Sequence, residues 1–362
     1  MIETASIRRA SPRRVVGTAA LMAILSWAVV VSYPGNVSPF GVSVLDSRQL
    51  RNRALRARQD GRADAANLVH LSARLGWRDS QIQYWLLEEA LQKQDYRSAV
   101  ERIDAVLRRK PVQAARLFPI LHALVMDAEG RDALLGRFRD APPWRLAFLQ
   151  DVTKLDGNAA NGHEALLDGM IVGGIASARD EVLPYVRRLL VLGEYGHAKD
   201  LWSRAIRDRS TPDNLAGTLA EIDTSLSDDR ISPFEWRARR VAGAELRAEA
   251  VGVRIIMDGS TFGTLAERTL VLKPGTYRIS VGNSNRSAFR DGRIGWSLSC
   301  LPGRGKLPLR SMDGQFAIPT SSCPAQQISL NARRAVQSAP ADIILSSVRI
   351  VPVAMSPMSP SK

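Results

Sequence analysis

Residue types that build catalytic and metal sites are scarce in this chain, which has two cysteines and four histidines among 362 residues. The histidines, His70, His122, His163 and His197, are far apart in sequence, and no Cys-x-x-Cys or His-Glu-x-x-His pattern accompanies them. The sequence also lacks a Gly-x-Ser-x-Gly motif and a Gly-rich phosphate loop. We therefore expect no catalytic residue, no metal and no cofactor. An enzyme stays open as an alternative if its carboxylates come from distant positions that no motif reveals.

Long apolar runs are also absent, with one exception at residues 15–33, which carry no charge and directly follow Arg8, Arg9, Arg13 and Arg14. At about 1.5 Å per residue, a helix of this length spans a bilayer core of about 30 Å. Arginines on the amino-terminal side favour a cytoplasmic start. We expect a cytoplasmic tail at residues 1–14, a transmembrane helix at 15–33 and a short stem at 34–45, with everything that follows across the membrane.

Three other interpretations of this run stay open. A cleaved secretory signal has the same basic start, but its apolar core is usually about 7 to 15 residues long and ends in a small-x-small site. A buried core helix is usually apolar on one face only. The segment Ser11 to Arg14 is a poor match to a twin-arginine export signal. Both export interpretations still place the bulk of the chain outside the cytoplasm.

The positive charge is concentrated near the carboxyl end. The chain has a formal net charge of +14, of which residues 232–362 carry +10 from 18 basic and 8 acidic side chains. Such a surplus favours an anionic partner. For an exported domain without a basic, aromatic-rich RNA motif, nucleic acid is not expected. Acidic polysaccharide, lipopolysaccharide or the anionic membrane surface fit better, unless arginine is simply abundant in this proteome.

Residues 46–226 show helical periodicity, with small residues that recur at similar places. Ala65, Ala99 and Ala133 follow one another at steps of 34 residues, and Ala198 lies in a segment of the same form. This pattern resembles tetratricopeptide repeats, in which a small residue lies where two helices cross. The clearest unit is Gln81 to Pro111, with Asp95 and Tyr96 at its turn. A generic helical bundle is the alternative, and the glycines and asparagines of residues 157–174 are expected to interrupt the array.

Beyond a polar linker at 227–233, the helical period gives way to short alternating runs separated by turn signals. About eight strands in residues 234–354 predict an antiparallel β-sandwich, preferably of the jelly-roll type, followed by a disordered tail at 355–362. The predicted strands are Phe234–Arg240, Val253–Met257, Arg268–Leu272, Thr276–Val281, Gly295–Cys300, Gln315–Ile318, Gln327–Leu330 and Ile343–Val353.

The β region holds the predicted disulfide and the predicted binding residues. Cys300 and Cys323 are expected to pair in an oxidising compartment, with two free thiols as the alternative. Trp296 is expected in the core. Exposed aromatic rings would instead be platforms for sugars, with polar neighbours supplying hydrogen bonds. The glycan-binding candidates are Trp236, Tyr277, Arg278, Asn283, Asn285 and Arg286.

The segment from Leu272 to Ile279 resembles the strand-turn-strand of many extracellular β-sandwiches, including carbohydrate-binding modules. The predicted layout is an α + β multidomain protein with one transmembrane helix, a repeat-type helical solenoid and a basic sandwich. It resembles membrane-anchored tetratricopeptide proteins of Gram-negative bacteria associated with polysaccharide synthesis and export. The resemblance implies a non-catalytic scaffold in the inner membrane, with its bulk in the periplasm, whose repeats bind an envelope protein complex and whose sandwich binds an acidic polysaccharide. A protein-only assembly factor of a secretion or division complex is the alternative.

Overall fold

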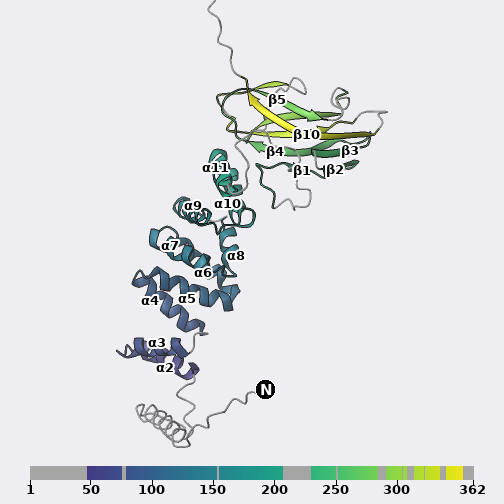
Figure 1. The fold of residues 1–362 in the computed structure, drawn as a ribbon. Coiled ribbons are helices and arrows are strands. Elements are labelled where there is room, and N and C mark those ends of the chain that lie inside the picture. Colours follow the sequence, from purple (N-terminus) through teal and green to yellow (C-terminus); the bar gives the residue numbers. More distant parts are fainter. Residues whose placement is uncertain are drawn as a thin grey trace, which may run out of the picture. The chain divides into compact units, whose positions relative to one another are not determined.

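A computed structural model of the chain shows a helical region followed by antiparallel sheets (Figure 1). It describes residues 47–75, 79–152, 155–206, 230–249, 252–283, 291–303, 305–307, 314–321, 323–334 and 340–353. The predicted tail, membrane helix, stem and carboxy-terminal tail lie outside these residues, as do residues 227–229 of the linker. Within the described ranges, no helix is both long and apolar enough to cross a membrane.

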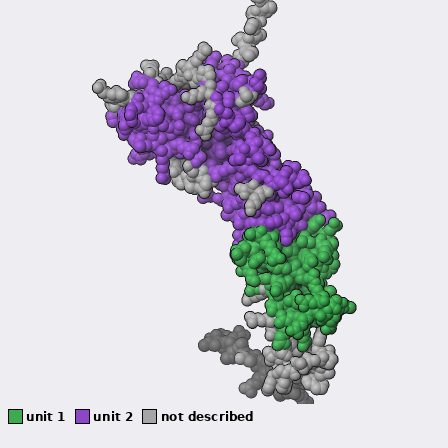
Figure 2. All heavy atoms as spheres, turned by 180° about the vertical axis from the view of Figure 1, so that it is seen from behind, with its two compact units in different colours: residues 1–117 green, residues 118–362 purple. Residues whose placement is uncertain are grey.

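The helices run from Ser47 to Ala205, within the predicted helical region. They are α2 (Ser47–Gln59), α3 (Ala65–Leu75), α4 (Ser80–Gln92), α5 (Tyr96–Arg109), η2 (Pro111–Gln113), α6 (Ala114–Leu124), α7 (Ala128–Phe138), α8 (Arg145–Gln150), α9 (Gly157–Val172), η3 (Ala178–Val182), α10 (Leu183–Val191) and α11 (Tyr195–Ala205). The chain divides into two compact units, residues 1–117 and 118–362 (Figure 2). The boundary lies within α6, so the second unit contains the later helices and all the strands.

Aspartates begin four of these helices. Asp79, Asp95, Asp127 and Asp156 are the N-caps of α4, α5, α7 and α9, and each carboxylate accepts one or two backbone N–H bonds from the first helical turn. Such caps satisfy N–H groups that have no partner inside the helix. The predicted helical hairpin around Asp95 and Tyr96 is confirmed, since α4 and α5 flank this turn. The tetratricopeptide type of the array stays a prediction.

The predicted small packing residues are mostly buried. Ala65 is 8% exposed, and Ala99 and Ala198 are fully buried, whereas Ala133 is only half-buried. Near α7 the chain also approaches closely at Gly130, where an added Cβ would lie 2.2 Å from the carbonyl oxygen of Leu124.

The predicted interruption at residues 157–174 is wrong. Gly157–Val172 form one helix of 16 residues, α9, which is capped by Asp156 and ends at Gly173. Leu166, Leu167 and Met170 on this helix are fully buried. Their packing outweighs the low helix propensity of its glycines and asparagines, because most helical stability in proteins comes from burying an apolar face.

The carboxy-terminal part contains two five-stranded antiparallel sheets, with strand orders β1-β4-β9-β6-β7 and β2-β3-β10-β5-β8. The strands are β1 (Arg237–Ala238), β2 (Ala244–Glu249), β3 (Gly252–Met257), β4 (Gly263–Leu270), β5 (Gly275–Asn283), β6 (Ile294–Leu301), β7 (Lys306–Leu307), β8 (Gln315–Ile318), β9 (Ala325–Ala332) and β10 (Ala341–Pro352). We call this part, residues 230–353, the β domain. The antiparallel sheets are as predicted, while the jelly-roll type stays a prediction.

One apolar core lies between the two sheets. It includes Ile255 and Ile343 from one sheet and Trp296, Leu298 and Leu330 from the other, all at most 8% exposed. Alternate residues of β6 point into this core, as the sequence predicted for Trp296, Leu298 and Cys300. The predicted disulfide is confirmed, because the sulfurs of Cys300 and Cys323 are 2.06 Å apart.

The predicted strand at Phe234–Arg240 is shorter than expected, because β1 contains only Arg237 and Ala238, which pair with β4. Before them the chain turns: the N–H of Glu235 donates to the carbonyl of Ser232 (3.0 Å), and the N–H of Phe234 donates to the hydroxyl of Ser232 (3.3 Å). Pro233 presets the backbone for such a turn. Phe234 and Trp236 are both buried, but they do not lie on one face of a strand.

Candidate functional site

An open pocket of about 500 Å³ lies in the second unit, beside the turn between α6 and α7 and the first turns of α9. Its lining combines apolar and amide side chains and consists of Met126, Arg131, Asn158, Asn161, Gly162 and Ala165. Concave surfaces that mix an apolar floor with a few polar groups are the usual form of a binding site. This is the candidate functional site.

Local structure holds the pocket open at its base. Gly162 lies against the turn after α6, where an added Cβ would be 2.4 Å from the carbonyl oxygen of Val125. The guanidinium of Arg131 donates through Nη1 to the carbonyl oxygens of Val125 (2.9 Å) and Met126 (3.3 Å). These bonds satisfy carbonyls at the end of α6 that have no partner within the helix. The wall formed by the α6–α7 turn is therefore fixed.

The exposed groups of the pocket suit a polypeptide. Met126 is 52% exposed, which is unusual for a large apolar side chain. Asn158, Asn161 and Ala165 are exposed beside it on α9. An asparagine amide both donates and accepts hydrogen bonds, as a peptide group does, and a methionine adapts to apolar side chains of different shapes. The pocket can thus hold an apolar side chain and the backbone next to it.

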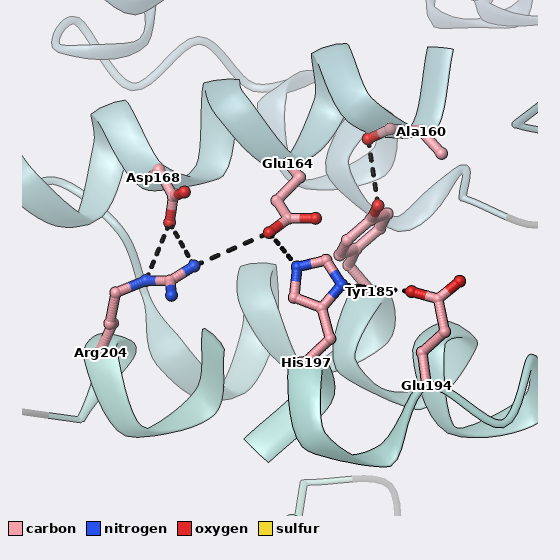
Figure 3. A network of polar contacts seen from close by, with 7 residues as sticks. All are labelled: Ala160, Glu164, Asp168, Tyr185, Glu194, His197 and Arg204. Atoms are coloured by element: carbon pink, nitrogen blue, oxygen red, sulfur yellow. Dashed lines mark hydrogen bonds and ion pairs between the residues drawn. The ribbon is translucent and has the colours of Figure 1, made fainter. Parts of the chain in front are cut away.

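A network of charged residues joins α9 to α11 (Figure 3). His197 Nε2 lies 2.5 Å from Glu164, and its Nδ1 lies 3.1 Å from Glu194. Arg204 donates to Asp168 at 3.0 and 3.2 Å and lies 3.7 Å from Glu164. Because Glu164 and Asp168 are one helical turn apart, the two contacts form a ladder between the helices.

These surroundings change the titration of His197. Partial burial favours the neutral ring, but hydrogen bonds and attraction from Glu194 and Glu164 outweigh this effect and raise the pKa of His197 above its ordinary value. Nearby, the hydroxyl of Tyr185 donates to the carbonyl of Ala160 (3.0 Å), and burial together with the charge of Glu164 raises its pKa to about 12. The network therefore connects two helices, α9 and α11, through charged side chains.

Two other histidines lie inside the second unit. His163 is fully buried, and burial lowers its pKa to about 3, so it is neutral at physiological pH. His122 stacks on Phe148 with ring centroids 4.7 Å apart, and burial also lowers its pKa. Their rings pack in an aromatic cluster with Tyr185. Across the residues that the structure covers, no group of three or more His, Cys, Asp or Glu could hold a metal ion.

The predicted sugar platforms of the β domain are buried. Trp236 is 4% exposed and lies beside Trp296, with ring centroids 5.8 Å apart. Tyr277 is 8% exposed, stacks on Phe316 and donates its hydroxyl to the carbonyl of Lys273 (2.9 Å). Two sheets packed face to face enclose both rings, so neither offers a surface for a sugar.

Of the four remaining glycan-binding candidates, two lie among the described residues. Arg278 is exposed on β5, and Asn283 ends the same strand. Asn285 and Arg286 lie outside the described residues. Among the described candidates, Trp236 and Tyr277 are buried and Arg278 is exposed, so these three do not form one exposed site.

No sequence pattern pointed to the pocket residues. Asn158, Asn161 and Gly162 stand in the segment that was predicted to interrupt the repeat array, and Met126 belongs to no motif. The available signal was Asp156, a helix cap directly before them, which indicates a helix start. No protein-family model matches the chain, and no curated protein matches its sequence.

Proposed function

We propose that the protein is a non-catalytic, membrane-anchored adaptor whose helical region binds a protein partner. The observation that supports this most is the pocket of Met126, Asn158, Asn161 and Ala165. It offers an apolar contact and two amide side chains on a rigid base. An extended peptide segment with an apolar side chain matches both features.

The partner segment would place its apolar side chain on Met126 and Ala165. Fully burying an exposed methionine is worth about 1.5–3 kcal/mol; because Met126 is already half-buried, covering its exposed half would contribute about 1 kcal/mol and make it the main apolar contact. Asn158 and Asn161 would exchange hydrogen bonds with the segment's backbone and fix its direction. Sequence selectivity would then rest on the size of the side chain that fills the pocket.

An exported position of the folded part is a second element of the proposal. The pairing of Cys300 with Cys323 supports it, because disulfides persist in oxidising compartments and are rare in the cytosol. The uncharged segment 15–33 with its preceding arginines supplies the proposed anchor. In a Gram-negative cell, the adaptor would work at the periplasmic face of the inner membrane.

Site-specific photo-crosslinking in intact cells tests this function. A photoreactive residue at Asn158 or Asn161 is expected to capture one discrete protein partner, because these positions border the pocket. The same residue at Val191, which is 88% exposed at the end of α10, is the control. Capture should disappear when Met126→Asp is introduced beside the crosslinker. Equal capture from Val191, or capture that survives Met126→Asp, would refute the pocket as the binding site.

A further inference from the structure

On the outer face of the sheet β1-β4-β9-β6-β7, short polar side chains surround Asn331 of the central strand, while the charged Glu267 lies farther along the same face. On the central strand β9, Ile328 and Leu330 are buried in the core, so the alternating residues Gln327, Ser329 and Asn331 point outward. Asn331 lies opposite Thr264 on one neighbouring strand and opposite Gly295 on the other.

Hydrogen bonds fix the orientation of the central amide. The hydroxyl of Thr264 donates to Oδ1 of Asn331 (2.9 Å). Nδ2 of Asn331 donates to the hydroxyl of Ser297 (2.8 Å) and to the carbonyl of Ser329 (3.2 Å). The three side chains come from three adjacent strands, which are spaced about 4.8 Å apart. They form a hydrogen-bonded row about 10 Å wide, in which the hydroxyl of Ser297 keeps its proton to donate.

Some of the residues on this face have a low intrinsic preference for β-strands. Asparagine and glycine are depleted in strands, and the difference between good and poor strand residues spans about 1 kcal/mol per position. The side chains of this row are short, and the bonds within it leave the hydroxyl proton of Ser297 and acceptor sites on Thr264 and Asn331 for a ligand.

A positively charged side chain, that of Arg333, lies beside this row of polar side chains. The guanidinium Nη2 of Arg333 lies 3.8 Å from the place that a Cβ on Gly295 would occupy, so it lies close to the sheet beside Asn331. Arg333 is exposed and forms no ion pair with any carboxylate in the described part of the chain. Elsewhere on the same face, Arg239 pairs with Glu267, which also accepts from Gln327 (2.8 Å). The charge of Arg333 is thus available.

We propose that this face binds an acidic polysaccharide. Arg333 would pair with a sugar carboxylate, while Thr264, Asn331 and Ser297 would bond to the ring hydroxyls. A row of fixed donors and acceptors suits a polyhydroxylated chain, and charge-assisted bonds to carboxylates are about twice as strong as neutral ones. This proposed site differs from the glycan-binding site predicted from the sequence, because it contains no aromatic ring. This binding is independent of the protein partner proposed for the helical pocket.

The test measures binding of polygalacturonate, with dextran as the neutral control, to the full-length protein in detergent. Arg333→Glu is expected to weaken polygalacturonate binding about tenfold or more, because it removes one charge-assisted pair and introduces repulsion. Arg349→Glu is the matched control: Arg349 is exposed on the outer face of the other sheet, and its change alters the net charge equally. Gly295→Glu, which puts a carboxylate beside Arg333, should act like Arg333→Glu.

Selective loss in Arg333→Glu and Gly295→Glu, with Arg349→Glu within about twofold of the wild type, would support the site. Circular dichroism spectra that match the wild type would confirm that the variants fold. An equal loss in Arg349→Glu would show that net charge alone attracts the polymer and would overturn the proposal. Absence of polygalacturonate binding at about 0.15 M salt, or equal binding of dextran, would overturn it as well.

Discussion

Gly130 and Gly162 allow two helices to approach the end of α6 so closely that no side chain fits. An added Cβ would lie 2.2 and 2.4 Å from backbone oxygens of Leu124 and Val125, which cannot move without shifting the turn. The same turn carries Met126, the apolar side chain of the pocket. At the residue scale, stability and the proposed binding therefore depend on the same contact.

Gly162→Ala is expected to destabilise the protein by about 1–3 kcal/mol, because overpacking forces the backbone apart. Chemical denaturation followed by circular dichroism measures the loss. Gly136→Ala is the matched control, since Gly136 lies within α7 with no atom close to its missing Cβ. Alanine is the better helix former, so this control should gain about 0.5–1 kcal/mol. A neutral Gly162→Ala would show that the turn after α6 is not rigid.

His197 predicts a pH dependence of stability with a definite sign. Its pKa is raised above 6.5 in the folded protein, so its pairing with Glu164 and Glu194 stabilises the fold fully below pH 6.5. This stabilisation is lost as pH rises through the folded pKa. The buried His163 and His122 act in the opposite sense, because their lowered pKa values destabilise the fold as pH falls below 6.5.

The contribution of His197 is isolated by comparing the wild type with His197→Gln. The difference in free energy of unfolding between them should be larger at about pH 6 than at about pH 8, since only the wild type gains from the charged ring. Denaturant titrations at both pH values measure it. A difference that does not change with pH would mean that Glu164 and Glu194 do not stabilise the protonated ring.

Among the elements, strands with alternating buried residues were predictable, including the edge strand β8, whereas the edge strands β2 and β7 were not. The alternation of Trp296, Leu298 and Cys300 predicted β6. Strand β2 was missed because Ala244–Glu249 is an edge strand in which no residue is fully buried, so no clear alternation shows. The burial of Trp236 and Tyr277 depends on how two sheets pack, which short-range patterns do not contain.

The helical elements show the same limit. Caps and periodicity predicted the hairpin of α4 and α5, but the glycines of α9 were interpreted as an interruption. Gly162 is required there by contact with Val125, a residue far along the chain. Local propensity is a weak guide where tertiary contact decides. The pocket was unpredictable for this reason, because its two walls come from separate helices.

The disulfide ties the end of β6 to the residues just before β9. Because it closes a loop between cysteines 23 positions apart, its removal is expected to lower the stability of the β domain by about 3 kcal/mol. Thermal unfolding of the Cys300→Ser, Cys323→Ser double variant measures this loss. A reductant should destabilise the wild type and leave the variant unchanged. If the reductant has no effect on the wild type, the bond is not structural.

For the whole molecule, the proposed function requires that the β domain is exported from the cytoplasm. The full chain extracted from cells should carry the Cys300–Cys323 bond, so denatured protein should react with a maleimide only after reduction. A chain without residues 1–33 should stay in the cytosol, where thiols are kept reduced, and should react without reduction. Gel-shift labelling distinguishes the two states. Free thiols in the full-length chain would place the β domain in a reducing compartment.

Because the two proposed binding sites are separate, a mutation in one should not reduce binding at the other. Arg333→Glu should leave protein crosslinking from Asn158 unchanged, and Met126→Asp should leave polygalacturonate binding unchanged. The sites lie on different elements, and mutations that share no contacts usually act additively. Binding assays on the single variants measure this independence. Loss of both activities in either variant would indicate general unfolding rather than a local effect.

The central claim is that the pocket beside α6, α7 and α9 binds a protein partner. Titration of the crosslinked partner into the full-length protein in detergent tests it most directly. Met126→Asp should weaken binding about tenfold or more, while Val191→Asp, at a more exposed position that does not line the pocket, should match the wild type. If Met126→Asp binds the partner with wild-type affinity, the pocket is not the binding site.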